Sequence, residues 1–253
     1  ELARNEGHDD EQQRRYPRPA GGHIIGYYSI LHGTNGAEAG FNTILRGETD
    51  DFLSDWFRRT IHLPQIGRDV QLALDYGMQE TAEGVLGDNR GGALLLELPR
   101  DGKHSARVKA MASLPGYEAN QLDASFEELG SAVDAPLLNR VTQGQYQPGL
   151  LLQPMILASS IDQGLLRLNQ TVKDPDRPVQ VNGSELRCVA QPPDPATWAD
   201  VLAYRCPAPM VDLADRAGVS GLDVAFSAFG LDRNPILEID TETTPDQPPE
   251  DPL

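Results

Sequence analysis

The residues that could do chemistry in this chain are few, and they lie far apart in the sequence. A serine or cysteine nucleophile needs a base within hydrogen-bond reach. Ser159 and Ser160 lie about nine residues beyond an expected helix start, so we predict a structural role for both. Cys206 has no histidine partner in the sequence pattern, and a lone cysteine is more often inert. Asp75 is better interpreted as a helix cap than as an acid.

A lysine could serve as the base for a serine, but the chain has only three lysines, Lys103, Lys109 and Lys173. Residues 100, 106 and 170, three places before them, are arginine, alanine and glutamine, so no Ser-x-x-Lys pattern occurs. The sequence also lacks Ser-x-Asn, Lys-Thr-Gly and Lys-Ser-Gly. The histidines at 23, 32, 62 and 104 lack an Asp/Ser partner pattern. The lysines and histidines therefore indicate no catalytic pair.

The two cysteines, Cys188 and Cys206, predict no metal site, because the chain has neither a CxxC pattern nor clustered histidines. They could pair as a disulfide in an oxidising compartment or remain two buried thiols. The sequence leaves both open, with thiols the preferred interpretation. We expect no cofactor.

Net charge and apolar content limit the classes of partner that the chain could bind. The chain has 253 residues, a formal net charge of −17 and an apolar content of 39%. This acidic balance argues against nucleic acid or an anionic membrane surface as the main partner. No apolar run approaches the roughly 18 residues needed to cross a bilayer. We expect one large domain or one domain with a smaller module.

Several elements are expected from pattern. Asp50–Arg59 predicts a short helix, and Asp69–Asp75 predicts a strand. Asp75 is then expected to cap a helix over 76–86, with Met78, Ala82 and Val85/Leu86 on one face. Residues 92–98 and 106–112 predict a hairpin whose first strand is buried on both faces. A helix is expected from Leu150 to about Leu168, a small strand at 185–190, and two capped helices starting near Thr197 and Ser220, with Gly218 and Gly230 just past helix ends. The tail from Thr241 cannot bury a core and predicts a linker.

Short strings in a shared order resemble the class B penicillin-binding proteins, the transpeptidases that cross-link peptidoglycan. Arg15-Tyr16-Pro17, Gly33-Thr-Asn-Gly36-Ala-Glu38 and Leu45-Arg46-Gly47 resemble the non-catalytic N-terminal region of that family. Asp75 with Gln79 resembles the entry to the transpeptidase domain. Ala110-Met111-Ala112-Ser113 resembles a later conserved segment, and Pro136-Leu-Leu-Asn139-Arg140 followed by Tyr146-Gln-Pro148-Gly149 resembles the approach to the catalytic serine. The pattern is most similar to the actinobacterial-type enzymes.

At the positions where the family has its catalytic residues, this chain has residues of other types. In the family, Pro-Gly is followed by Ser-x-x-Lys at a helix start, but here Leu150 takes the serine position and Gln153 the lysine position. The family's Ser-x-Asn is expected at 205–207, where Arg205 replaces the serine and Pro207 the asparagine. Leucine has no nucleophile, and glutamine is no base near neutral pH. We therefore expect no acylation.

The resemblance implies an α/β (α+β) fold, with helices around a partial antiparallel sheet, and a small N-terminal module. We expect residues 1–66 to belong to the non-catalytic module, 67–240 to an incomplete transpeptidase-like domain, and 241–253 to a flexible tail. The family implies a place on the outer side of the bacterial cell membrane, with contact to the membrane only through an anchor that this chain does not contain.

Three hypotheses for function follow. The first is an inactive scaffold or binding protein in cell-wall synthesis or division, with a cell-envelope or divisome protein, or peptidoglycan, as its partner. The second is an active D,D-transpeptidase or acyltransferase with an unrecognised nucleophile, for which Cys206 and Ser160 are the suspects. The third is a decayed or truncated product without a role.

Overall fold

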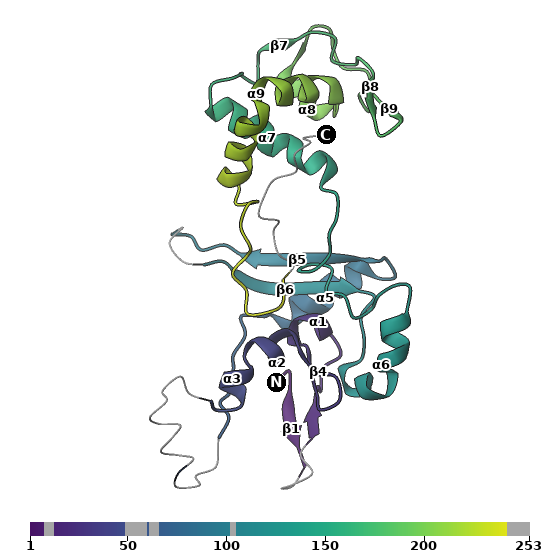
Figure 1. Ribbon diagram of the computed structural model, residues 1–253, viewed down its shortest axis with the longest axis vertical. Helices are drawn as coiled ribbons and strands as arrows, with labels where there is room; N and C mark the ends of the chain where they lie inside the picture. The colour runs from purple at the N-terminus through teal and green to yellow at the C-terminus, as the bar shows by residue number, and fades with distance from the viewer. Residues whose placement is uncertain (8–12, 49–59, 61–65, 102–104, 242–253) are drawn as a thin grey trace. The chain divides into compact units, whose positions relative to one another are not determined.

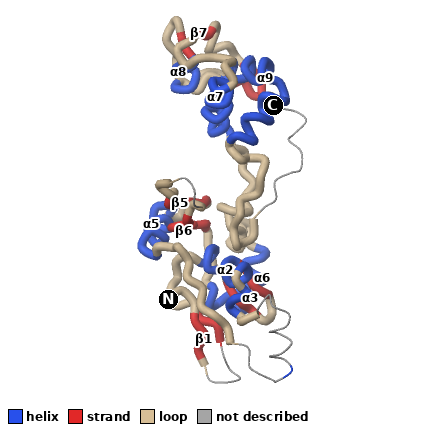
Figure 2. Tube along the Cα trace, turned by 90° about the vertical axis from the view of Figure 1, so that its left-hand side faces the viewer, coloured by secondary structure: helices blue, strands red, loops and turns tan. Residues whose placement is uncertain are grey.

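The chain folds into two units, and each has its own hydrophobic core. A computed structural model describes residues 1–7, 13–48, 60, 66–101 and 105–241. The first unit comprises Glu1–Gln145 together with Pro235–Glu242, and the second comprises Tyr146–Asn234 and the last residues of the chain. Figures 1 and 2 show the elements of each unit. The predicted helix at 50–59, residues 102–104 between the two strands of the predicted hairpin, and residues 242–253 of the tail lie outside the described residues.

The N-terminal part of the first unit is built from short elements that close on one another. Two antiparallel pairs are formed, β1 with β2 and β3 with β4. Three short helices join or follow them. The bounds are β1 Arg4–Glu6, β2 Gln13–Arg15, α1 Gly22–Ile25, β3 Tyr27–Ser29, β4 Gly33–Asn35, α2 Gly36–Gly40 and α3 Asn42–Leu45.

The centre of the first unit is a helix packed on an antiparallel hairpin. Helix α5, Tyr76–Leu86, begins at the predicted cap, where the Asp75 carboxylate accepts from Met78 N, and ends at Gly87, whose φ is 54°. The hairpin joins β5, Gly91–Glu97, to β6, Arg107–Leu114. Figure 1 shows α5 beside these strands. The predicted hairpin and helix are confirmed.

Two details of that prediction are wrong. Residues 94–96 of β5 are leucines that are each about 45% exposed, whereas Ala110, Met111 and Ala112 of β6 are buried. The buried strand is therefore β6. On α5, Met78 and Val85 are exposed, Ala82 and Leu86 are partly buried, and Gln79 is fully buried. The helix packs through a polar side chain that bonds β6, so apolar spacing identified only part of the buried face.

The strand predicted at 69–75 is also wrong. Burial alternates along these residues, but no neighbouring strand pairs with them among the described residues. Pairing defines a strand, and the sequence pattern reports only the alternation. Further along, a short 3₁₀ turn, Ala119–Gln121, leads into α6, Leu122–Ser131. Tyr16, Ile25, Met111, Tyr117 and Leu122 are among the residues that form the core of the first unit.

The second unit is mainly helical. A 3₁₀ turn, Gly149–Leu151, leads into α7, which packs against α9, while short strands form two-stranded antiparallel pairs. The bounds are α7 Leu152–Asp162, β7 Thr171–Val172, β8 Val179–Val181, β9 Ser184–Leu186, β10 Ala196–Thr197, α8 Trp198–Ala203 and α9 Pro207–Ala228. The core is formed by Leu157, Leu166, Trp198, Val201, Cys206 and Leu213.

Helix limits in the second unit differ partly from the expected ones. The helix expected to reach about Leu168 ends at Asp162, and the predicted strand at 185–190 is shortened to β9. The capping box of Thr197 with Asp200 is present, as predicted. The expected break near Gly218 is a kink inside α9, where Gly218 alone has non-helical dihedrals (φ 64°, ψ −178°). Gly230 follows the end of α9 with φ 69°, as the pattern indicated.

Candidate functional site

The first part of the candidate site is the start of α7. Gly149 has a positive φ of 53°, which suits glycine, and it begins the 3₁₀ turn that leads into the helix. Leu150 lies in this turn and is 47% exposed, and Leu151 is 71% exposed. Gln153 is the second residue of α7 and is partly buried. A helix start of the expected form is present, but its side chains are apolar or neutral.

The second part is the connection between α8 and α9. Arg205 adopts a positive φ of 53° and is exposed to solvent. Cys206 is the N-cap residue of α9 and is completely buried. Pro207 is the first residue of that helix, where its missing N–H costs no hydrogen bond. An arginine and a proline cannot replace the hydroxyl and amide of a Ser-x-Asn pattern.

Cys188 and Cys206 form a disulfide, so the preferred interpretation of two thiols is wrong. Cys188 follows β9, and backbone pairing brings the two segments together: Val189 N donates to Tyr204 O at 2.9 Å. The bond ties the chain between β9 and α8 to the beginning of α9. This contact depends on tertiary folding across 18 residues, which spacing alone could not predict.

The structure brings the two parts of the site into one unit. α7 and α9 pack against each other, and Leu157 of α7 lies in the same buried cluster as Cys206. Ser159 and Ser160 are buried in α7 at 7% and 2% exposure, which confirms their structural assignment. Lys173, in the same unit, is exposed after β7. No group of three His, Cys, Asp or Glu side chains among the described residues could hold a metal ion.

Sequence reasoning missed a set of buried polar side chains in the first unit. Gln79 Nε2 donates to Met111 O at 2.9 Å and to a Glu83 carboxylate oxygen at 2.8 Å, and Gln79 Oε1 accepts from Met111 N at 2.8 Å. Arg14 bonds Glu38 through two nitrogens, at 2.8 and 2.7 Å. The four-residue spacing of Gln79 and Glu83 was the available signal.

His23 belongs to a second cluster of buried polar side chains. Its side chain is 6% exposed and its ring meets that of Tyr117 edge-on at 5.1 Å. Burial, with a smaller contribution from the nearby Arg140 guanidinium, lowers the pKa of His23 to about 4. Arg140 is itself buried and donates to the backbone carbonyls of Asp134, Ala135 and Leu138. These contacts hold loops of the first unit together and include no nucleophile.

Comparison with known families agrees with this architecture. Residues 102–251 match the model described as the penicillin-binding protein transpeptidase domain, and residues 1–66 match the penicillin-binding protein A dimerisation domain. The first match covers more than half of the chain. The chain belongs to the penicillin-binding protein transpeptidase family. Its class B assignment and its fold, a transpeptidase-like domain with an N-terminal module, are thereby confirmed.

Individual relatives carry the names of transpeptidases. The chain is 28% identical to the peptidoglycan D,D-transpeptidase PbpA of Mycolicibacterium smegmatis over 88% of its own length and 48% of that protein. It is 33% identical to the peptidoglycan D,D-transpeptidase MrdA of Escherichia coli over 49% of its length and 19% of that protein. The chain therefore spans less than half of either relative.

Solved structures of low identity share the fold. The penicillin G acyl-enzyme complex of penicillin-binding protein A from M. tuberculosis aligns over 96% of this chain and 60% of that one, with a TM-score of 0.78 at 21% identity. A D,D-transpeptidase domain from Eggerthella lenta aligns over 96% of this chain and 54% of that one, with a TM-score of 0.73 at 22% identity.

Proposed function

We propose that this protein is a catalytically inactive relative of the peptidoglycan D,D-transpeptidases, with a scaffold or binding role in cell-wall synthesis or division. The observation that carries the proposal is the pair Leu150 and Gln153 at the start of α7. They occupy the positions that the family resemblance assigns to the nucleophilic serine and its lysine, after an intact Tyr-x-Pro-Gly approach.

The chemistry of acylation explains why this pair is decisive. The serine oxygen would bond to the β-lactam carbonyl carbon, the ring C–N bond would break, and the hydroxyl proton would pass through the base to the ring nitrogen. Leu150 offers no oxygen, and the Gln153 amide accepts no proton near neutral pH. Arg205 and Pro207 likewise replace the residues expected to relay that proton.

The alternative, an acyltransferase with another nucleophile, receives no support from its two suspects. The Cys206 sulfur is bonded to Cys188, and Ser160 is 2% exposed inside α7. A nucleophile must reach the substrate, and neither side chain does so in this fold.

The cellular setting and division of the chain are part of the same proposal. A disulfide in a buried core favours an oxidising compartment, which agrees with the extracytoplasmic side of the membrane. None of the described helices is both long and apolar enough to cross a membrane. We assign residues 1–66 to a non-catalytic module, 67–240 to a transpeptidase-like domain and 241–253 to a tail, with an envelope or divisome protein, or peptidoglycan, as the partner.

Labelling with a fluorescent penicillin tests the proposal. The complete 253-residue chain and M. smegmatis PbpA, as the positive control, are incubated with the reagent and measured by gel fluorescence and intact mass. We expect labelling of the control and no adduct on this chain. A stoichiometric adduct, mapped by peptide mass spectrometry, would refute the inactive assignment and identify the nucleophile.

A further inference from the structure

The segment from Arg68 to Asp75 is anchored at each end by a backbone hydrogen bond. Arg68 N donates to Ile44 O at 3.1 Å, and Asp75 N donates to Lys109 O, on β6, at 2.9 Å. Between these two contacts, the backbone of residues 69–74 makes no hydrogen bond to any residue that the structure describes. The segment is therefore fixed in place while its own donors and acceptors remain unpaired.

The beginning of this segment is also fixed by close backbone packing. A Cβ atom added to Gly67 would lie 2.0 Å from Leu45 O, and one added to Gly47 would lie 2.2 Å from Ile66 O. The chain after α3 and the chain entering the segment thus touch through glycines. This contact makes the segment a rigid edge rather than a free loop.

Burial alternates along the segment as it does in a strand. Val70, Leu72 and Leu74 are partly buried, whereas Gln71 and Ala73 are exposed. Leu74 packs against the main core of the first unit. A segment with alternating burial and unpaired backbone groups is a template for an added β-strand.

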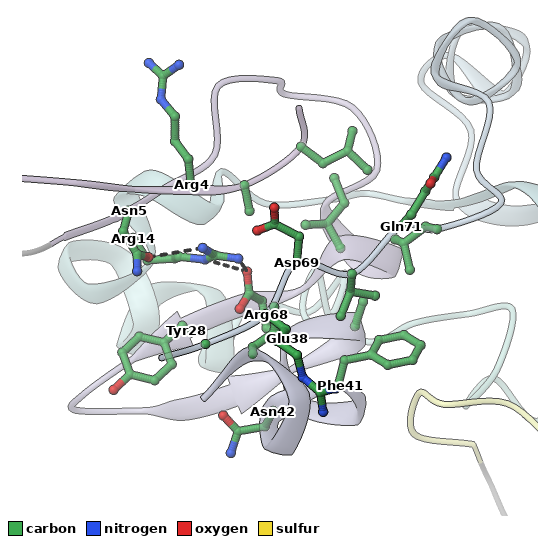
Figure 3. A pocket seen from close by; sticks show the side chains of 18 of the residues that line it. Arg4, Asn5, Arg14, Tyr28, Glu38, Phe41, Asn42, Arg68, Asp69 and Gln71 are labelled. Atoms are coloured by element: carbon green, nitrogen blue, oxygen red, sulfur yellow. Dashed lines mark hydrogen bonds and ion pairs between the residues drawn. The ribbon is translucent and has the colours of Figure 1, made fainter. Parts of the chain in front are cut away.

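A groove of about 1160 Å³ lies beside this edge. Arg68, Asp69 and Gln71, labelled in Figure 3, are among the residues that line it. Apolar side chains from α1, α2 and α3 also line it. They are Ile25, Ala37, Phe41 and Leu45. Ile25 and Ala37 are buried, whereas Phe41 and Leu45 are partly exposed, so Phe41 and Leu45 supply the apolar surface for the inward side chains of a strand paired with residues 70–74.

Charge in the groove favours a carboxylate at one end of such a strand. Arg14 and Glu38 neutralise each other through their two short contacts, marked in Figure 3. Arg46 forms an ion pair with Glu48, with 3.5 Å between Arg46 Nε and Glu48 Oε1. Arg68 lines the groove and has no ion pair with any described residue, although the chain as a whole carries −17. Asp69 and Glu1 also line the groove, so its four arginines exceed its three carboxylate side chains by one, and the Arg68 guanidinium is the group that a ligand carboxylate would meet.

We propose that this groove binds an extended strand of a partner polypeptide, which pairs with Val70–Leu74 and places a carboxylate next to Arg68. The strand's inward side chains are apolar and alternate with outward ones. A second copy of the same segment fits less well: the antiparallel register that pairs all of residues 70–74 sets Asp69 of each copy against Asp75 of the other. The chain's own tail, with prolines at 245, 248, 249 and 252, lacks the donors that a strand needs.

Hydrogen–deuterium exchange with synthetic peptides tests the pairing. The probe is a capped nonapeptide of alternating valine and threonine with one terminal glutamate, compared with versions that carry lysine at that end or proline at alternate positions. We expect the glutamate peptide to slow exchange at residues 69–74 and the proline peptide to have no effect. Equal protection by the proline peptide, or none by any peptide at millimolar concentration, would overturn the proposal.

A charge exchange tests the register. Arg68→Glu should reverse the preference, so that the lysine peptide binds about two- to five-fold more tightly than the glutamate peptide at low salt, as expected for one exposed ion pair. Arg107→Glu, an exposed residue of β6 outside the groove lining, makes the same change in net charge and should keep the original preference. Unchanged preference in Arg68→Glu would contradict the assignment.

Hydrogen–deuterium exchange of the protein without peptide tests whether a second copy of the chain occupies the groove. We expect residues 69–74 to exchange rapidly at all protein concentrations, while β6 remains protected in the wild type and in both variants. Protection of 69–74 that grows with protein concentration would show that a second copy fills the groove and would overturn the choice of partner.

Discussion

Replacing Gln79 should separate the contribution of one buried polar side chain from that of helix packing. Gln79 is completely buried, and its amide bonds both the N–H and the carbonyl of Met111. Met111 stands opposite Leu94 of β5, and its N–H and carbonyl bond Gln79 on the other side of β6. The Gln79 side chain therefore makes the two backbone hydrogen bonds that a neighbouring strand would make with Met111.

The expected cost follows from those bonds. In Gln79→Leu, the Met111 N–H and carbonyl lose their partners at a residue that is 1% exposed, and each unpaired group costs about 1–3 kcal/mol. Glu83 keeps its bond from Gly21 N at 2.7 Å, so it adds little. Burial of the leucine side chain offsets part of the loss. We expect a loss of about 2–5 kcal/mol in the free energy of unfolding of the first unit.

Denaturant-induced unfolding with exchange at β6 amides measures this change and assigns it to the first unit. Glu80→Leu is the matched control, because Glu80 is the next residue of the same helix, is exposed and receives the same side chain. It should change stability by less than about 0.5 kcal/mol. Equal effects of the two substitutions would refute the reasoning that Gln79 completes the edge of β6.

Three further predictions concern other parts of the fold. Burial holds the pKa of His23 near 4, whereas an unfolded histidine titrates near 6.5. The first unit should therefore keep its full stability above pH 6.5 and lose up to about 3 kcal/mol as the pH falls toward 4. In acid unfolding of His23→Gln, the free energy of unfolding should not show this dependence on pH. Gly26→Ala should destabilise the first unit by at least about 2 kcal/mol, because the added Cβ would lie 1.8 Å from Asn35 O. Gly33→Ala, with nearly the same φ (81° against 80°) but no atom within 4 Å, should cost markedly less in the same melt. Removing the disulfide with Cys188→Ala and Cys206→Ala should lower the stability of the second unit by about 2–4 kcal/mol, measured by thermal unfolding with exchange at α8, and leave β6 exchange unchanged; a loss confined to the first unit would contradict it.

The sequence by itself determined the features that depend on neighbours along the chain. The Asp75 cap, the Thr197–Asp200 capping box and the hairpin of β5 and β6 each follow from side chains a few residues apart. The emptied positions Leu150 and Gln153 are also visible in sequence, because the family pattern is a linear one. The family assignment rested on such strings, and the comparisons confirmed it.

Tertiary structure decided what depends on contacts between distant segments. Apolar spacing predicted one face with Met78, Ala82 and Val85/Leu86, but Met78 and Val85 are exposed and α5 packs through Gln79, whose partner Met111 is 32 residues away. The leucine run of β5 indicated a doubly buried strand, whereas burial belongs to β6. The segment 69–74 has the pattern of a strand and lacks the partner that would make it one. Pairing, burial and the disulfide are properties of two segments at once, and a single stretch of sequence records only its own half of each contact.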